Sequence, residues 1–237
     1  MIERRKQFKR VPKKYQPQGL TILYEDHDIL VVDKVSGLLT VSSEKVRENT
    51  AYYRLTDYVR KGNRKSTKRI FIVHRLDRDT SGIIVFAKSE KSKRFLQEEW
   101  HGFKKIYAAL VHGAPAEKEG SITSYLAENR FHKMYSVTDP KKGKLARTGY
   151  KVVEESDRFS LLEVDLLTGR KNQIRVYMAD QGFPVVGDKK YGQGERGIRR
   201  LMLHALSITL QHPHTKQKMT FETELPVCFN ELLNRNN

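Results

Sequence analysis

The sequence predicts an α+β fold with a mostly antiparallel, mixed sheet of about eight strands and flanking helices. Several short segments alternate or run apolar over five to nine residues, which is typical of strands. A few segments space their apolar residues at helical intervals, and they do not alternate regularly with the strands. With 237 residues, 38% of them hydrophobic, the chain is long enough to bury a sizeable core.

The N-terminal quarter of the chain contains a basic arm, two strands and a helix. Residues 1–18 carry seven Lys or Arg and two prolines, which predicts a flexible arm ahead of one folded domain at 19–237. LTILYE and DILVVDK predict two strands separated by the polar turn at 25–28. Residues 50–60 predict a helix, because their apolar side chains recur four positions apart.

The remaining elements follow the same logic. IFIVH and GIIVFAK predict two strands around a polar break, and Ser89 is the predicted N-cap of a helix ending near His101. A further helix is predicted from about Asn172 to Asp180, closed by Gly182. Five more segments predict strands: KKIYAALVHG, GYKVVEE, FSLLEVDLL, LMLHALSITL and QKMTFETEL.

The charge balance predicts a polyanionic partner. The net charge is +17 and the pI is about 9.9. Nucleic acid is the first candidate; an anionic membrane is the second, although no long helix has a one-sided basic face. The single cysteine, Cys228, excludes an intrachain disulfide and a C-x-x-C site. Since MIERRKQFKR is no signal peptide and no stretch reaches membrane-spanning length, a cytoplasmic protein is expected.

The run IVHRLDRDTSG carries the densest set of polar groups beside an apolar strand. Burying a charge without a partner is costly, so such residues either face a cleft at a strand end or form an internal salt bridge or turn. Local sequence leaves these alternatives open.

Four blocks in order resemble the RluA family of pseudouridine synthases. HRLDRDTSGIIVFAKS resembles the family's catalytic signature, and its opening His74 separates it from the related RsuA group, which begins Gly-Arg-Leu-Asp. The resemblance implies that Asp77 is the catalytic carboxylate. DHDILVVDKVSGLLTV resembles the preceding block, and KKIYAALVHG the second element, which implies that Tyr107 contacts the base. LLTGRKNQIRVYMADQGFPVVGDKKYG and LMLHA resemble the third and closing elements, which implies Arg175 as partner of the catalytic carboxylate and Leu203 as pocket lining.

The resemblance also implies the wider properties of the protein. It implies a pseudouridine synthase fold with a central RNA-binding cleft, a catalytic domain at 19–237 without an S4 module, and structured ribosomal or transfer RNA as partner. No cofactor, no metal and a monomer are expected. The substrate-binding residues implied are His74, Arg75, Leu203, Arg170 and Asn172, with Arg75 filling the space that the target base vacates. Asn172 departs from the His of most members, which predicts a local adjustment.

The chemistry implied by the family needs a carboxylate at the sugar, either as a nucleophile at C1′ or as a base at C2′. A closed pocket favours protonation of a carboxylate, and an arginine opposes it because it stays charged. These needs match Asp77 and Arg175. The target base must leave its stack or lie in an unpaired loop.

Two other functions were weighed. Asp77-Arg78-Asp79-Thr80 resembles a haloacid-dehalogenase nucleophile loop, but the threonine comes one place early and strand–helix alternation is missing. A non-catalytic RNA-binding or ribosome-assembly factor of the same fold is the second alternative.

Several remaining residues have simpler interpretations. His204 is predicted to be a hydrogen-bonded core histidine. His212 and His214 suggest a turn, because no further metal ligand lies near them in sequence. The basic clusters at 60–69, 141–151 and 189–200 together fit a phosphate-binding track.

Overall fold

The computed structural model describes residues 12–42, 48–63, 65–192, 194 and 197–234. These residues form two compact units. The first contains residues up to Trp100 together with Gln211–Phe221, and the second contains His101–Leu210 and Glu222 onward. Most of the predicted basic arm, residues 1–11, lies outside the described residues, and Lys13–Tyr15 forms a short 3₁₀ turn.

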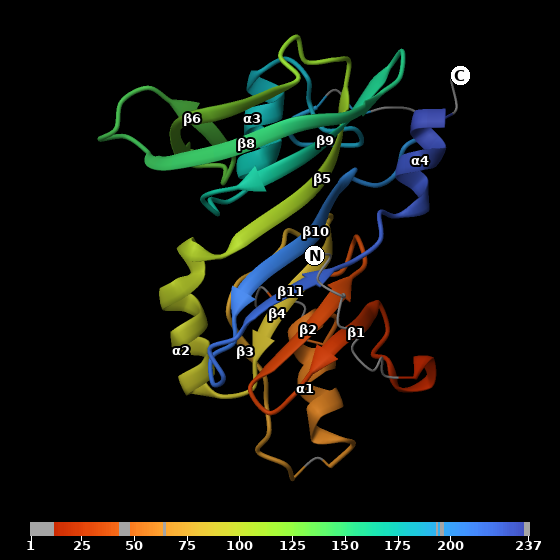
Figure 1. Cartoon of the computed structure of the whole chain (residues 1–237), viewed down its shortest axis with the longest axis vertical. Coiled ribbons are helices and arrows are strands. Elements are labelled where there is room, and N and C mark those ends of the chain that lie inside the picture. Colours follow the sequence, from red (N-terminus) through yellow and green to blue (C-terminus); the bar gives the residue numbers. More distant parts are fainter. Residues whose placement is uncertain (1–11, 43–47, 64, 193, 195–196, 235–237) are drawn as a thin grey trace, which may run out of the picture. The chain divides into compact units, whose positions relative to one another are not determined.

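The first unit is organised by three neighbouring strands. β2 pairs antiparallel with β1 on one side and with β4 on the other, and β3 also pairs with β4 (Figure 1). Most residues of β2 and all of β4 are buried, which explains why both read as continuous apolar runs. The strands of this unit are β1 (Leu20–Glu25), β2 (Ile29–Lys34), β3 (Phe71–Ile72) and β4 (Ser81–Ala87), and β11 (Lys218–Glu222) lies at its C-terminal end.

Two capped helices accompany these strands. The Thr50 side chain accepts a hydrogen bond from the Tyr53 N–H at the start of α1 (Ala51–Arg60). Ser89 does the same for α2 (Glu90–Glu98), as the sequence predicted, by accepting from the Ser92 N–H at 3.1 Å. α2 ends before the predicted His101, and the chain continues as a 3₁₀ turn over Glu99–Gly102.

The second unit is built on six antiparallel strands in the order β10-β5-β9-β8-β6-β7. A hydrophobic core formed by β5, β9, β10 and the two helices of the unit lies beneath one end of this sheet. The elements are β5 (Lys104–His112), β6 (Glu119–Glu128), β7 (Met134–Val137), β8 (Lys144–Glu155), β9 (Phe159–Leu166), β10 (Leu203–Gln211), α3 (Gln173–Asp180) and α4 (Val227–Asn234).

α3 packs on the part of the sheet formed by β6 and β8 (Figure 1). Its buried Tyr177 hydroxyl donates to the Ala146 carbonyl at 2.7 Å and accepts from the Ser124 N–H at 3.1 Å. One side chain thus links the helix to both strands, and fixes the position of the segment that carries Arg175.

The α+β prediction is confirmed, but the number of strands is larger than predicted. Eleven strands and four α-helices occur in the described ranges, and β6, β7 and α4 were not predicted. β6 and β7 were missed because most of their side chains are exposed or half-buried, so they show no apolar run. IFIVH forms a strand only at Phe71–Ile72, since the Gln97 side-chain amide donates to the carbonyls of Ile72 and Val73. None of the helices described is long and apolar enough to cross a membrane.

His204 lies in the core of the second unit, as predicted, and only 1% of it is exposed. Burial lowers its pKa to about 4, helped by the charge of Arg200 and opposed by a hydrogen bond with the backbone of Glu224. The imidazole is therefore neutral at physiological pH.

A pH titration of stability tests this assignment. Because the folded pKa of about 4 lies below the usual 6.5, the unfolded chain binds the proton first, and folding free energy falls as pH drops between these values. The loss attributable to His204 is about 3 kcal/mol at most. We expect His204→Leu to flatten this slope in urea titrations, whereas an unchanged slope would contradict the assignment.

Candidate active site

Asp77 lies in the loop between β3 and β4 of the first unit. Its side chain is half-buried, the preceding Leu76 is buried, and the flanking Arg75 and Arg78 are exposed. Arg78 forms a surface ion pair with Asp79 at 3.2 Å, a contact of small energetic value. The loop therefore anchors one apolar side chain inward and presents its charged groups outward.

Hydrogen bonds hold the loop backbone on both sides of Asp77. The Thr40 hydroxyl donates to the Leu76 carbonyl at 2.8 Å and accepts from the Leu76 N–H at 3.3 Å. On the far side, the Gly37 N–H donates to the Arg78 carbonyl at 2.9 Å, and the Ser36 hydroxyl donates to the Asp79 carbonyl at 2.6 Å. The 36–40 segment thus fixes the position of Asp77 without touching its carboxylate in any of these bonds.

A buried lysine joins these two segments. Lys34 ends β2 with 0% of its surface exposed, and its ammonium donates to three backbone carbonyls. The acceptors are Val35 at 3.0 Å, Leu38 at 2.8 Å and Arg78 at 3.2 Å. An ammonium has three donors, so this arrangement offsets the cost of burying the charge. Lys34 was not singled out by the sequence analysis, although a lysine after an apolar strand is a usable signal.

His74 has structural contacts in the same loop. Its Nε2 accepts the Val85 N–H at 3.0 Å, and its ring stacks on Trp100 with centroids 4.2 Å apart. These contacts hold the imidazole against β4. Its predicted role in substrate binding stays a prediction.

Tyr107 and Leu203 lie on neighbouring strands of the second unit. Tyr107 in β5 pairs with Ala205 of β10, and Leu203 pairs with Ala109, so the two side chains share one face of the ladder. Leu203 is buried, whereas Tyr107 is half-buried at the border of the core. The structure therefore brings together two residues that the resemblance assigned to the uracil pocket.

The start of α3 is fixed by Gln173, a buried residue that the sequence analysis did not single out. Its carbonyl oxygen accepts from the Arg170 N–H at 3.0 Å and the Thr168 hydroxyl at 2.8 Å. Its amide donates to the Arg147 carbonyl and the Thr148 hydroxyl, both at 2.8 Å. All four hydrogen-bonding positions of this amide are thus used to attach the 168–173 turn to β8.

The other predicted residues of this turn have defined positions. Arg170 donates through Nε to the Leu145 carbonyl at 3.0 Å. Asn172 adopts φ 54°, a left-handed conformation that asparagine tolerates better than most residues, and its side-chain oxygen accepts from the Tyr191 hydroxyl at 3.2 Å. The departure from the family's usual histidine thus coincides with a backbone position suited to asparagine.

Arg175 points to Asp188 within the second unit. Its Nε lies 2.7 Å from Asp188 Oδ2, and both side chains are buried. The sequence analysis missed Asp188, although an acidic residue in an otherwise apolar and basic stretch is a possible signal. Asp77 belongs to the first unit, and its predicted partnership with Arg175 stays a prediction.

The hairpin between β6 and β7 presents an exposed aromatic ring among cations. Phe131 is 71% exposed, with the Arg130 guanidinium 4.7 Å from its ring centroid. The Asn129 side chain accepts the N–H groups of Phe131 and Lys133, which orders the turn. The ammonium of Lys190 donates to the His132 carbonyl, so further positive charge lies at the hairpin's tip.

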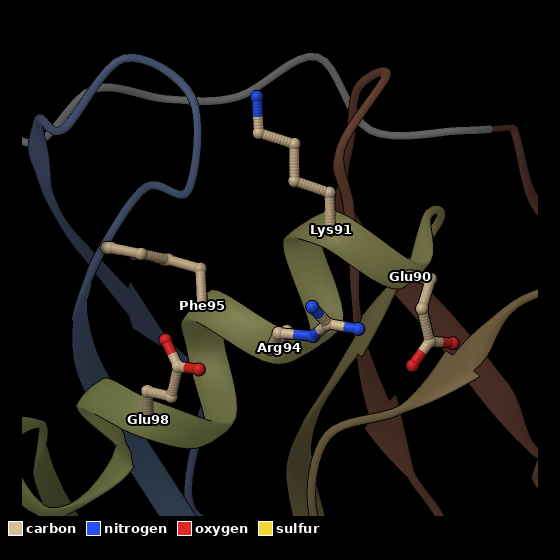
Figure 2. Close-up of a pocket in the computed structure, with 5 residues that line it drawn as sticks. All are labelled: Glu90, Lys91, Arg94, Phe95 and Glu98. Carbon is tan, nitrogen blue, oxygen red and sulfur yellow. The ribbon is translucent and has the colours of Figure 1, made fainter.

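A hollow along α2 has a different character. It is lined by one helix, and Figure 2 shows Phe95 directed toward a neighbouring loop. Lys216 lies 3.3 Å from the Phe95 ring centroid. Its charges are mixed in sign, and none of the predicted site residues is among its lining residues Glu90, Lys91, Arg94, Phe95 and Glu98.

The prediction that His212 has no ligand-type residue near it was wrong in three dimensions. Asp26 and Asp28 come close to it, and His212 Nε2 lies 2.8 Å from Asp26 Oδ2. However, His212 Nδ1 accepts two backbone N–H groups, which leaves the proton on Nε2 for Asp26. Asp26 also accepts from the Tyr24 hydroxyl and the N–H groups of Asp28 and Ile29. This cluster therefore anchors a turn.

Comparison with known proteins places the chain. The family model described as RNA pseudouridylate synthase matches residues 28–180. The chain belongs to this RluA-type family. As a pseudouridine synthase, it is an isomerase that acts on uridine in RNA.

Its relatives agree with this placement. The chain is 36% identical over 217 residues to the uncharacterised RNA pseudouridine synthase YhcT of Bacillus subtilis (strain 168), covering 90% of this chain and 71% of the relative. It is 34% identical over 224 residues to ribosomal large subunit pseudouridine synthase C of Buchnera aphidicola subsp. Schizaphis graminum (strain Sg), covering 90% and 69%. The solved structure of human RNA pseudouridylate synthase domain containing 1 matches with a TM-score of 0.71 and 26% identity, covering 91% of this chain and 86% of that one.

The Lys34 ammonium provides a test of the loop's construction. Lys34→Met would remove three hydrogen bonds from a charged donor and leave the carbonyls of Val35, Leu38 and Arg78 without it, so we expect a loss of roughly 3 kcal/mol in unfolding free energy. The matched control is Lys88→Met, since Lys88 makes a partly exposed ion pair with Glu25 and should cost below about 1 kcal/mol. Equal losses in urea denaturation would contradict the buried-cation argument.

Proposed function

We propose that this enzyme isomerises specific uridines in ribosomal or transfer RNA, with Asp77 as the carboxylate that acts on the sugar. The observation that supports this most is the fixed loop around Asp77. Lys34, Ser36 and Thr40 all bond to backbone atoms of the loop, so the structure orders the chain around the carboxylate. Such preorganisation is what a reacting group requires.

The reaction assigns distinct tasks to the predicted residues. The C1′–N1 bond breaks, the uracil turns, and a C1′–C5 bond forms while the C5 proton is released, so the net change is an isomerisation. Asp77 acts either at C1′ as a nucleophile or at C2′ as a base. Arg175 keeps a carboxylate charged in a desolvated site, and the Tyr107 ring provides a face for the uracil.

Surface charge supports RNA as the partner of the folded chain. The predicted cluster at 60–69 is mostly exposed, and so are most of the cations at 141–151. The β6–β7 hairpin adds Phe131 with Arg130 beside it, a combination suited to an unstacked base and its phosphate. We include this hairpin in the RNA-binding surface.

Mapping of pseudouridine tests the catalytic assignment. RNA from cells lacking this protein would be probed by carbodiimide-dependent reverse-transcription stops, with rescue by wild type, Asp77→Asn and Asp79→Asn. We expect a stop that disappears in the deletion, returns with wild type and with Asp79→Asn, and stays absent with Asp77→Asn. Asp79 is the matched control, because it is a carboxylate of the same loop paired with Arg78 at the surface.

The outcomes separate the competing functions. On purified RNA, Asp77→Asn should lower the rate by roughly 10³-fold or more. If every stop in ribosomal and transfer RNA persists in the deletion, the proposal fails and a non-catalytic RNA-binding role gains support. If Asp77→Asn restores the stop, the assignment of Asp77 is wrong.

The hairpin is tested by the salt dependence of RNA affinity. We expect Phe131→Ala to weaken binding by about 1–3 kcal/mol without changing the slope of log K against log salt, since stacking releases no counterion. Arg130→Gln should reduce the slope by about 1 if it contacts a phosphate. Val227→Ala is the control, because Val227 is equally exposed at 71% but lies on α4. A flat salt response of the wild type would contradict a phosphate-dominated interface.

A further inference from the structure

The Arg175–Asp188 pair is a buried, two-pronged ion pair. Arg175 Nε donates to Asp188 Oδ2 at 2.7 Å, and Nη2 donates to Oδ1 at 2.8 Å. Their side chains are 10% and 0% exposed. Two parallel bonds of this kind fix the plane of the guanidinium as well as its distance.

Asp188 is itself held by the backbone. Its Oδ1 also accepts the N–H groups of Lys190 at 2.8 Å and Tyr191 at 3.0 Å. Burial would raise the pKa of this carboxyl, but the bonds and charge of Arg175 and the two backbone N–H groups keep it below its usual value. Asp188 is therefore a permanently charged acceptor on a fixed turn.

Tyr191 restricts the guanidinium from a second direction. Its ring centroid lies 5.2 Å from Arg175 Cζ, within the range of a cation–π contact. The Tyr191 hydroxyl donates to Asn172 Oδ1 at 3.2 Å and accepts from the Met134 N–H at 3.1 Å. The ring is thus anchored to the N-terminus of α3 and to β7.

The geometry defines which end of Arg175 remains for chemistry. Asp188 takes the Nε–Nη2 edge of the planar guanidinium, so the Nη1 end is turned away from Asp188. An arginine that reaches a reacting carboxylate loses rotational freedom, and a pre-formed edge contact removes much of that loss before substrate binds.

We propose that Asp188 is a positioning residue for catalysis, which holds the guanidinium of Arg175 so that its Nη1 end serves the reacting carboxylate, with the Tyr191 ring as the backing surface. This inference rests on the proposed function, because it gives Arg175 its task. Asp188 acts through Arg175 and touches no reacting atom.

A double-mutant cycle in single-turnover kinetics tests this. We expect Asp188→Asn to lower kcat by about 10- to 100-fold, because misplacing a catalytic group has effects of this size. RNA affinity, measured separately, should change less than about twofold, since a residue that only positions Arg175 contributes no phosphate contact. The combined Arg175→Ala, Asp188→Asn variant should react no more slowly than Arg175→Ala alone.

A control and a second variant separate positioning from folding. Asp26→Asn removes another multiply hydrogen-bonded carboxylate, so it should lower the melting temperature while leaving kcat of the folded fraction unchanged. If Asp188→Asn does not fold, Tyr191→Phe and Tyr191→Leu carry the test. Phe keeps the ring and should keep kcat within about threefold, whereas Leu should lower it further.

The outcomes are distinct. A kcat for Asp188→Asn within twofold of wild type, beside a large loss in Arg175→Ala, would overturn the positioning role and leave the proposed function intact. Multiplicative effects in the cycle would overturn it as well. If Arg175→Ala keeps the wild-type kcat, Asp188 has no catalytic group to position, and the failure belongs to the assignment of Arg175. If the wild type isomerises no uridine, the proposed function itself fails.

Discussion

The ammonium of Lys34, buried at the end of β2, is the interaction on which the Asp77 loop depends. A buried cation needs an acceptor for each donor, and here all three acceptors are backbone carbonyls. One of them, the Arg78 carbonyl, lies 44 residues along the chain and directly follows Asp77. Satisfying one charge therefore ties the end of β2 to the loop and to the turn at 35–38, and the hydroxyls of Ser36 and Thr40 extend the same attachment.

The second unit solves the same problem with a carboxylate instead of carbonyls. Arg175 is buried on α3, and Asp188 neutralises it through two short bonds. Gln173 and Tyr177, on the same helix, use their polar groups to attach α3 to β8. Because each polar group on the buried side of this short helix has a partner of its own, the helix has one well-defined orientation. An unsatisfied group at any of these positions would cost stability as well as order.

Much of the fold followed from local patterns. Continuous apolar runs located β2 and β4, and the position of Ser89 before an amphipathic segment located the start of α2. β6 and β7 escaped because their sequence is polar on a largely exposed surface, so hydrogen bonding to neighbouring strands, and not burial, defines them. The residues that carry the family resemblance, including Asp77 and Arg175, were named from sequence motifs. No local pattern distinguished them from surface or core residues.

By itself, the sequence determined the family, the type of fold and the residues expected to do chemistry, because motifs and apolar periodicity are properties of neighbouring positions. Only the tertiary structure decided the partners of the buried charges. Asp26 and His212, 186 positions apart, form one hydrogen-bonded anchor, and Asp188 rather than any local residue receives Arg175. The physical reason is that a charge inside a protein takes whichever groups the folded chain brings within about 3 Å, and sequence spacing does not specify that distance.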